Sequence, residues 1–440
     1  MIYYVAMASR KRKRTTTTER SGFFRFLKRI GPGFITGAAD DDPSGIATYS
    51  QTGATFGFQQ LWTPFVTLPL MTAVQETCGR IGMVTGNGIA GVIKKHYPKT
   101  TIALFVGLLL VTNAINIGAD LGAMADAGEL LFGIPFTIWL IGITTVTLTL
   151  IIFVPYASYV KILKVLTLSL LAYIASVFVI RVDWSIVATA VIIPKFSFSK
   201  DFLLNIVALL GTTISPYIFF WQANQEAEEE VLDKKIAGIG DGRPRVTQKM
   251  LKGLRLDTAL GMLLSNVIMF FIILTTAATL HANGITDIET AADAAQALRP
   301  LAGDFTFVVF ALGIIGTGLL AIPILAGSGA YAVAELKGWR SGLSLKPRQA
   351  KGFYGVIVLV TVAGLIVNYL GIPPFKMLYY TAVLNGIAAP PLLFLILRVA
   401  NDRKIMGCHV NSRLSNILGW TTFTVMTLAC LALLVATVLG

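Results

Sequence analysis

The chain has 440 residues, of which 55% are hydrophobic and only 13% are charged, against roughly 25% charged in an ordinary soluble domain. So little polar surface would not cover so much apolar volume, and this excludes a soluble globular protein. The formal net charge of +13 is compatible with nucleic-acid binding by itself, but the positions of the charges exclude that interpretation.

The apolar residues occur in blocks of about 18–25, the length that crosses a bilayer as a helix. We predict eleven spans, near residues 33–56, 58–78, 101–131, 136–154, 162–180, 203–225, 256–280, 304–334, 353–371, 376–397 and 415–438. With the N-terminus in the cytoplasm, the cytoplasmic segments hold 31 of the 36 Lys and Arg residues. This positive-inside bias predicts a multi-pass protein of the plasma or inner membrane whose C-terminus lies outside.

The first segment, residues 1–29, is a basic tail that contains five consecutive Lys and Arg residues at positions 10–14. We interpret it as a cytoplasmic topology anchor, with contact to anionic lipid as the alternative. Residues 30–440 then form a single transmembrane domain. The connection at 226–255 is charged and is predicted to be a loop with a helical start.

Two of the spans are interrupted. The first reads Gly-Pro-Gly-Phe-Ile-Thr-Gly-Ala-Ala-Asp-Asp-Asp-Pro-Ser-Gly at 31–45, and the sixth reads Leu-Leu-Gly-Thr-Thr-Ile-Ser-Pro-Tyr at 209–217. A proline removes a helical hydrogen bond, and unwound backbone at membrane depth is tolerated only inside protein or along a cavity. Their separation by five spans predicts two inverted repeats of five helices, with the substrate bound where the broken helices meet.

The first break carries three aspartates, and each charge at bilayer depth costs at least ~2.5–3.5 kcal/mol. Asp42 adjoins the proline, so we expect it to be a cation ligand. Asp40 and Asp41 point in other helical directions. They either reach water at the mouth of the site or, for one of them, carry a proton along the pathway.

Polar residues in other spans are further candidates. Asn113, Asn116 and Asp120 share one face of the third span, and a buried ionisable group such as Asp120 is a functional candidate. Asn116 and Asp120 are therefore predicted pathway or coupling residues, together with Asp41. Residues that either line the site or make structural hydrogen bonds are Thr213, Tyr217, Thr381 and Asn385.

At these residues the chain resembles the NRAMP family of divalent metal transporters. The resemblance covers essentially the whole chain and is carried by Gly31-Pro32-Gly33-Phe34, Asp42-Pro43-Ser44-Gly45, Ala47-Thr48, Gly53-Ala54-Thr55-Phe56-Gly57, Asp120-Leu121 and Gly211-Thr212. It implies an all-α, LeuT-like fold with repeats at about 30–181 and 203–398 and an extra helix at 415–438. It also implies a secondary transporter, not an enzyme, whose metal ligands include the Asp42 carboxylate and the carbonyls of Ala39 and Thr212.

The chain departs from the pattern of this family at several site positions. Gly45 stands where the family has an asparagine ligand, Ser215 where it has a methionine, and Tyr217 where it has a histidine. Ala123 replaces a glutamate that often follows the aspartate of the third span. We expect Ser215 to serve as a hydroxyl ligand and Gly45 to leave a gap that water fills.

Oxygen-only ligands suit Mg²⁺ and Mn²⁺, whereas sulfur favours softer metals. The substrate is therefore predicted to be Mg²⁺ or Mn²⁺, and the pattern is similar to the magnesium-type branch of the family that also lacks the methionine. The alternative is an amino-acid or organic-amine transporter of the same fold. In that case Asp42 binds an ammonium group inside a cage of Tyr217, Phe219 and Trp221.

Overall fold

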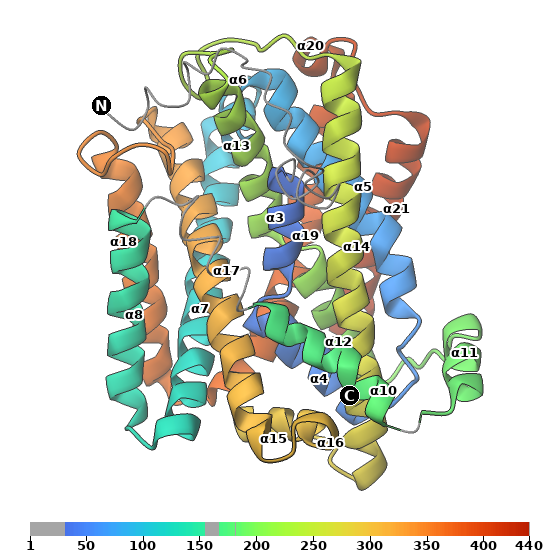
Figure 1. Ribbon diagram of the computed structural model, residues 1–440. Helices are drawn as coiled ribbons and strands as arrows, with labels where there is room; N and C mark the ends of the chain where they lie inside the picture. Colours follow the sequence, from blue (N-terminus) through green and yellow to red (C-terminus); the bar gives the residue numbers. More distant parts are fainter. Residues whose placement is uncertain (1–30, 155–166, 181, 440) are drawn as a thin grey trace, which may run out of the picture.

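The computed structural model describes residues 31–154, 167–180 and 182–439, and this part of the chain forms helices and no strand. The predicted basic tail lies outside the described residues. The long helices are α5 (Thr63–Thr85), α7 (Lys99–Phe132), α8 (Phe136–Phe153), α14 (Gln248–Thr279), α17 (Thr306–Lys337), α18 (Lys351–Val367), α19 (Pro374–Asn401) and α21 (Arg413–Leu439). Most of them run lengthwise through one bundle (Figure 1).

Two pairs of shorter helices replace the spans that carry a proline. These pairs are α3 (Pro32–Asp40) with α4 (Pro43–Phe56), and α12 (Lys200–Thr213) with α13 (Pro216–Leu232). The remaining α-helices are α6 (Ile89–His96), α10 (Leu171–Val179), α11 (Trp184–Ile192), α15 (Ala291–Ala295), α16 (Arg299–Ala302) and α20 (Arg403–Met406). Five short 3-10 helices complete the described chain: η1 (Thr167–Leu170), η2 (His281–Asn283), η3 (Gln296–Leu298), η4 (Gly303–Phe305) and η5 (Asn368–Leu370).

By length and composition, eight helical stretches of the described residues could cross a membrane. They correspond to the predicted third, fourth and sixth to eleventh spans. The first predicted span is the interrupted pair α3 and α4, the second is α5, and the fifth lies partly outside the described residues. The arrangement confirms the predicted class, an all-α polytopic membrane protein.

Two predicted boundaries were wrong. The second span was predicted at 58–78, but α5 runs from Thr63 to Thr85 and takes Arg80 into the protein interior. The helical start predicted for the connection 226–255 is present, since α13 continues to Leu232, but α14 begins at Gln248, before the seventh span predicted from 256, and this shortens the loop. Buried polar partners in the folded protein stabilise these helix ends, and hydropathy alone does not report such partners.

The helices form two groups. Helices α7, α8, α17 and α18 contact one another, and α3, α4, α5, α13 and α14 contact one another in a second group. Figure 1 shows the first group on the left and the second towards the centre and right. Three of the four segments of the broken helices, α3, α4 and α13, therefore belong to the second group, which lies against the α7 and α17 side of the first. The fourth, α12, contacts α19, α21 and α4.

Glycines bring α3 and α14 into backbone contact. A Cβ atom at Gly37 would lie 2.2 Å from the carbonyl carbon of Gly261, which no side chain could accommodate. Asp257 of α14 accepts hydrogen bonds from the N–H groups of Gly31 and Phe34, at 2.9 and 3.2 Å. These contacts fix the start of α3 on α14 and so set where the break after it falls.

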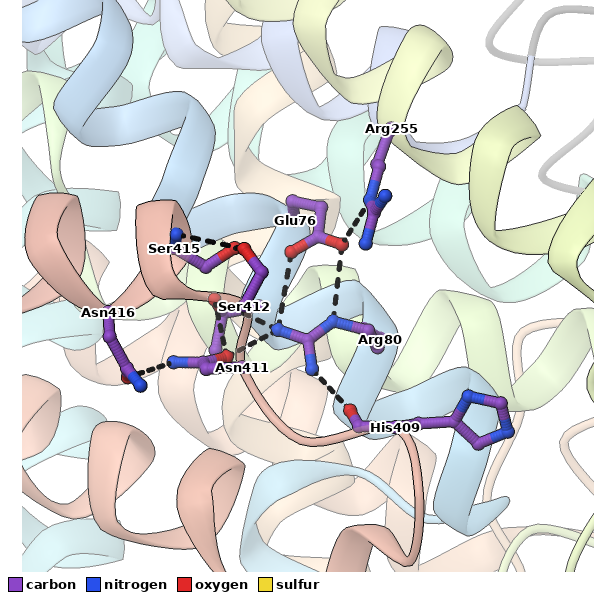
Figure 2. Close-up of polar contacts among 9 residues, drawn as sticks. Glu76, Arg80, Arg255, His409, Asn411, Ser412, Ser415 and Asn416 are labelled. Atoms are coloured by element: carbon purple, nitrogen blue, oxygen red, sulfur yellow. Dashed lines mark hydrogen bonds and ion pairs between the residues drawn. The ribbon is translucent and has the colours of Figure 1, made fainter.

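The Lys and Arg residues of the described chain concentrate at one end of the bundle, the upper end in Figure 1. We name this the basic end; α5, α13, α17 and α19 end there, and α14, α18 and α21 begin there. Arg80 of α5 bonds to Glu76 of its own helix and to Asn411 and the His409 carbonyl before α21 (Figure 2). Arg255 of α14 bonds to the same glutamate at 3.1 Å. This Arg80 cluster joins α5 and α14 to the segment before α21 at the basic end.

Candidate functional site

The first broken helix places Asp42 at the start of α4. Pro43 has no N–H, so the carbonyl of Ala39, one turn earlier, lacks its helical donor and α3 ends before the proline. Asp42 is the N-cap of α4, and its Oδ1 accepts hydrogen bonds from the Gly45 N–H at 2.8 Å and the Ser44 hydroxyl at 2.7 Å. The positive end of the helix dipole also favours a carboxylate here. Local sequence thus determines both the break and its carboxylate.

The second broken helix follows the same rule. Pro216 begins α13, so the carbonyl of Thr212 lacks its helical donor. The Ser215 hydroxyl lies 2.6 Å from the Gly211 carbonyl oxygen and 2.9 Å from that of Thr212, and it donates its hydrogen to them. Because a hydroxyl also has two acceptor lone pairs, the Ser215 oxygen remains able to bind a cation. Its role as a ligand stays a prediction, as do those of the two carbonyls.

The two breaks meet at Asp42. Tyr217 donates its phenolic hydrogen to Asp42 Oδ2 over 3.1 Å, and Asn116 of α7 donates to the same oxygen over 3.3 Å. The hydroxyls of Ser44 and Thr212 lie 3.4 Å apart, which joins α4 to α12. Asp42 thus receives four hydrogen bonds, about as many as the lone-pair sites of a carboxylate. A cation that binds Asp42 must displace at least one of these donors.

Of the polar residues on one face of α7, one makes a structural contact between helices and another contacts Asp42. Asn113 donates to the carbonyl of Leu325 in α17 at 2.8 Å, so it joins two helices. Asn116 belongs to the site, and its own Oδ1 accepts a hydrogen bond from Asn385 of α19 at 3.4 Å. Asn116 and Tyr217 therefore contact the Asp42 carboxylate, and Asn385 contacts Asn116. Their roles in the site stay predictions.

Asp120 lies one turn beyond Asn116 on α7. It is fully buried, and neither carboxylate oxygen has a hydrogen-bond partner among the described residues. Asn116, one helical turn before it, donates a hydrogen bond to Asp42, so Asp120 lies on the part of α7 that follows the site. An unpaired buried carboxylate is costly, so its position next to the breaks is consistent with the predicted pathway role.

Asp40 and Asp41 do not lie at a water-filled mouth in this structure. Their side chains are 0% and 1% exposed. The hydroxyl of Ser265 on α14 lies within hydrogen-bonding distance of both carboxylates, at 2.9 Å from Asp40 and 3.1 Å from Asp41. The expectation that they reach water was wrong here, because α14 packs over the end of α3. Whether Asp41 belongs to the pathway stays a prediction.

The other predicted lining residues differ in their contacts. Thr213 is turned towards its own helix, where its hydroxyl donates to the carbonyl of Leu209 at 2.8 Å. At Gly45, a Cβ atom would lie 3.3 Å from the ring of Tyr49 and 3.4 Å from the hydroxyl of Thr212. The gap expected at Gly45 is therefore already filled by neighbouring side chains. Thr381 donates to the carbonyl of Leu378, again within its own helix.

The site carries negative charge without a protein cation. Among the described residues, no Lys, Arg or His side chain forms an ion pair with any of the four buried aspartates. No group of three or more His, Cys, Asp or Glu side chains in these ranges is placed to hold a metal. A ligand set here would therefore combine few carboxylates with hydroxyl and carbonyl oxygens.

Sequence reasoning missed three side chains of this region. Ser44 and Tyr49 lie on the first turns of α4, and the spacing of Ser44 two residues after Asp42 is a typical signal for an N-cap contact. Ser265 is a single serine in a long apolar helix and offers no comparable signal. Its contact with the two aspartates depends on how α14 crosses α3.

Comparison with known proteins identifies relatives over almost the whole chain. The model of the family described as "Natural resistance-associated macrophage protein-like" (Nramp) matches residues 33–436. A manganese transporter of Eremococcus coleocola, solved with an aromatic bis-isothiourea compound, is 18% identical; the match covers 96% of this chain and 89% of that one, with a TM-score of 0.72.

A more distant structure shares the fold. Mhp1, a nucleobase-cation-symport-1 family transporter in a closed conformation, is 13% identical, with 93% and 92% of the two chains covered and a TM-score of 0.58. These likenesses confirm the predicted LeuT-like fold, in which substrates bind where broken helices meet.

Proposed function

Because the chain belongs to the Nramp family, we propose that it is a secondary transporter that moves a divalent metal cation, Mg²⁺ or Mn²⁺, across a cell membrane. Membership of a family of membrane transporters confirms the predicted class, a transporter and not an enzyme. The choice of cation and the roles of individual residues are our proposal.

The observation that carries this proposal is the uncompensated negative charge at the breaks. Asp42 lies between the two broken helices, with Asp40, Asp41 and Asp120 buried nearby and no protein cation paired to any of them among the described residues. Buried charges are normally paired or bind metals. A divalent cation is the simplest partner that would enter the site, be held by this negative charge and leave again.

We propose that the cation is held by oxygen atoms alone. The ligands are the Asp42 carboxylate, the Ser215 hydroxyl and the carbonyls of Ala39 and Thr212, which the prolines leave without helical donors. Hard oxygen ligands match Mg²⁺ and Mn²⁺. Mg²⁺ also keeps several waters when bound, and a site with only one close carboxylate suits that property.

Two observations support different members of this pair of ions. The structural similarity to a manganese transporter supports Mn²⁺ as the substrate of this chain. The serine at position 215, where the family pattern has a sulfur ligand, favours Mg²⁺ and the magnesium-type branch. We therefore propose both ions as substrates and expect softer metals to be transported less well.

Access to Asp42 requires movement of its present partners. Tyr217 and Asn116 each hold Oδ2 through one long hydrogen bond, at 3.1 and 3.3 Å. Bonds of this length are weaker than the two short bonds that hold Oδ1. We propose that the incoming cation displaces Tyr217 or Asn116 and leaves the N-cap contacts of α4 intact.

We place the basic end in the cytoplasm, with the N-terminus inside and the C-terminus outside. This follows from the location of 31 of the 36 Lys and Arg residues in segments on that side. The bilayer is then the only partner that the composition requires besides the metal substrate. We expect no nucleic-acid partner, since the positive charge follows the topology.

The amino-acid or organic-amine alternative is not favoured. Its predicted aromatic cage would need the ring faces of Tyr217, Phe219 and Trp221 around an ammonium group. In the structure Tyr217 presents its hydroxyl to Asp42, while Trp221 packs edge-on against Tyr331 at 6.3 Å between ring centroids. All three side chains are buried.

The test is uptake into proteoliposomes that contain the purified protein. Mg²⁺, Mn²⁺, Cd²⁺ and a panel of amino acids are compared, with empty liposomes as the control. We expect uptake of Mg²⁺ or Mn²⁺ and none of the amino acids. Uptake of an amino acid without metal uptake would overturn the proposal.

A further inference from the structure

A second polar site lies at the basic end, away from the helix breaks. It is a partly open cavity of about 160 Å³ at the end of α5, lined also by residues of α6, the segment 233–247 and the short helix α20. Figure 1 shows α6 and α20 at this end of the bundle. A single water needs only about 10–15 Å³ on the same measure, so this cavity has room for a small polyatomic ion.

Three basic side chains line the cavity: Lys95 and His96 at the end of α6, and Arg243 from the segment 233–247. Among the described residues, neither Lys95 nor Arg243 forms an ion pair. Lys95 Nζ donates to the Asn87 side-chain oxygen at 3.2 Å and to the Gly240 carbonyl at 3.4 Å. These are neutral acceptors, so the positive charge in the cavity is not neutralised by them.

Three acidic side chains of neighbouring segments have other partners or point elsewhere, among them Asp402, which accepts a hydrogen bond from the Lys404 N–H at the start of α20. Glu335 of α17 accepts hydrogen bonds from the N–H groups of Gly88 and Gly91 at 2.6 and 2.7 Å, at the start of α6. Asp241 is exposed, and its carboxylate lies on the Gly238 side of the loop. None of these carboxylates lines the cavity, which leaves donors of Lys95 and Arg243 for an added anion.

The walls of the cavity are fixed by backbone contacts. The N–H of Gly240 donates to the carbonyl of Gly86 at 2.7 Å, which ties the segment 233–247 to the end of α5. Gly240 has a φ of 92°, and a Cβ atom there would lie 2.9 Å from the Asn87 side-chain oxygen. Only glycine fits this conformation without strain. Arg243 is held in turn by a bond to the Lys404 carbonyl, at 3.2 Å.

We propose that this basic pocket binds a phosphate group. Arg243 offers a planar fork of donors that suits phosphate oxygens, and Lys95 adds a compact positive charge. The phosphate comes either from a phospholipid headgroup or from a free phosphate compound on the same side of the membrane. The pocket shares no residue with the Asp42 site.

The experiment measures thermal unfolding of the purified full-length protein in detergent. One arm adds inorganic phosphate, with sodium chloride at equal ionic strength as the reference. The other adds micellar phosphatidic acid, with phosphatidylcholine as the reference. We expect the unfolding midpoint to rise in a saturable way in at least one arm; the arm that responds identifies the source.

The pocket variant is Lys95→Gln with Arg243→Gln, and its matched control is Lys249→Gln with Lys252→Gln, which removes two exposed charges outside the pocket. We expect the apparent affinity to fall at least tenfold in the pocket variant and to stay unchanged in the control. The unfolding midpoint without ligand verifies that both variants are folded. No response in either arm, or an equal response of both variants, overturns the proposal.

Discussion

Glu76 and Asp42 are both buried carboxylates, yet the protein surrounds them differently. Glu76 lies in the Arg80 cluster at the basic end, where Arg80 bonds to it at 3.1 and 3.3 Å and Arg255 at 3.1 Å (Figure 2). In the part of the chain that the structure describes, Asp42 accepts hydrogen bonds from neutral donors alone, those of Ser44, Gly45, Asn116 and Tyr217. Neutral donors orient a carboxylate and leave its charge in place, whereas an arginine cancels that charge.

We interpret this difference as the distinction between a structural cluster and the metal site that we propose. In the Arg80 cluster the counter-charge is covalently part of the chain, so the interaction is permanent and holds α5, α14 and the segment before α21 together. At the helix breaks no side chain of the described residues supplies a counter-charge, and in our proposal the metal ion supplies it. We therefore expect mutations in the first region to change stability and mutations in the second to change transport.

The largest expected effect is at Asp42. Asp42→Asn keeps the shape of the side chain but removes the only carboxylate that lies between the two breaks. A lost interaction of at least ~3 kcal/mol with the cation lowers uptake by roughly 100-fold or more. The measurement is Mn²⁺ or Mg²⁺ uptake into proteoliposomes, with thermal unfolding recorded in parallel.

The control is Asp201→Asn, which removes an exposed carboxylate at the start of α12. It should transport at the wild-type rate. The Asp42→Asn variant should unfold at or above the wild-type temperature, because an uncompensated buried charge has been removed. Wild-type uptake by Asp42→Asn would exclude Asp42 as the central ligand.

Both helix breaks could be predicted because their causes are local. Pro43 and Pro216 lack an N–H wherever they occur, and Asp42 precedes a proline that begins a helix, so its side chain caps that helix. The polar face of α7 was predictable from its helical spacing. These features require no knowledge of which helices pack together.

The environments of Asp41 and Arg80 were not predictable in this way. Asp41 is buried because α14 lies over the end of α3 and offers Ser265. Arg80 is buried because Asn411 and the His409 carbonyl, more than 300 residues away in sequence, close around it. A hydropathy average takes no account of the partners of a charged side chain. It therefore placed the end of the second span before Arg80.

The second-largest expected effect is a loss of stability when the Arg80 cluster is broken. Arg80→Ala leaves Glu76 inside the protein with Arg255, whose side chain is 53% exposed, as its remaining ion-pair partner. Breaking a buried pair by removal of one member costs about 3 kcal/mol. We expect a clear fall in the unfolding temperature, measured by tryptophan fluorescence in detergent.

Arg255→Ala provides the graded control, because an exposed ion pair contributes about 1 kcal/mol or less. Its unfolding temperature should lie between those of the wild type and Arg80→Ala. Folded Arg80→Ala protein should still transport metal when assayed at low temperature. If Arg80→Ala instead unfolded like the wild type but lost transport, the cluster would belong to the transport mechanism.

A smaller effect is expected at Asp120, which has neither an arginine nor a hydrogen-bond donor among the described residues. If it lies on the pathway, Asp120→Asn slows uptake by about tenfold, equivalent to 1.4 kcal/mol, or changes its pH dependence. Binding of the cation at Asp42 should persist. Uptake identical to wild type at every pH would make Asp120 structural and would limit the functional region to the breaks.

The smallest expected effect is at residue 215, where a substitution tests which cation the site prefers. Ser215→Met replaces a hard hydroxyl by a soft thioether, which favours Cd²⁺ over Mg²⁺. The hydroxyl also donates to the Gly211 and Thr212 carbonyls, at 2.6 and 2.9 Å, so the change frees two carbonyl oxygens. Freed carbonyls still suit hard ions, and we therefore expect a shift in preference of only about threefold to tenfold, less than 1.4 kcal/mol.

Ser215→Ala separates the two consequences of that substitution, because it frees the carbonyls without adding sulfur. Competition of Cd²⁺ with Mg²⁺ or Mn²⁺ uptake is measured for all three proteins. A shift towards Cd²⁺ in Ser215→Met alone assigns it to the thioether and places residue 215 in contact with the cation. An equal shift in Ser215→Ala assigns it to the carbonyls and removes the side chain from the ligand set. If the wild type already prefers Cd²⁺ strongly to Mg²⁺, the oxygen-only site is wrong, because oxygen ligands alone favour hard ions.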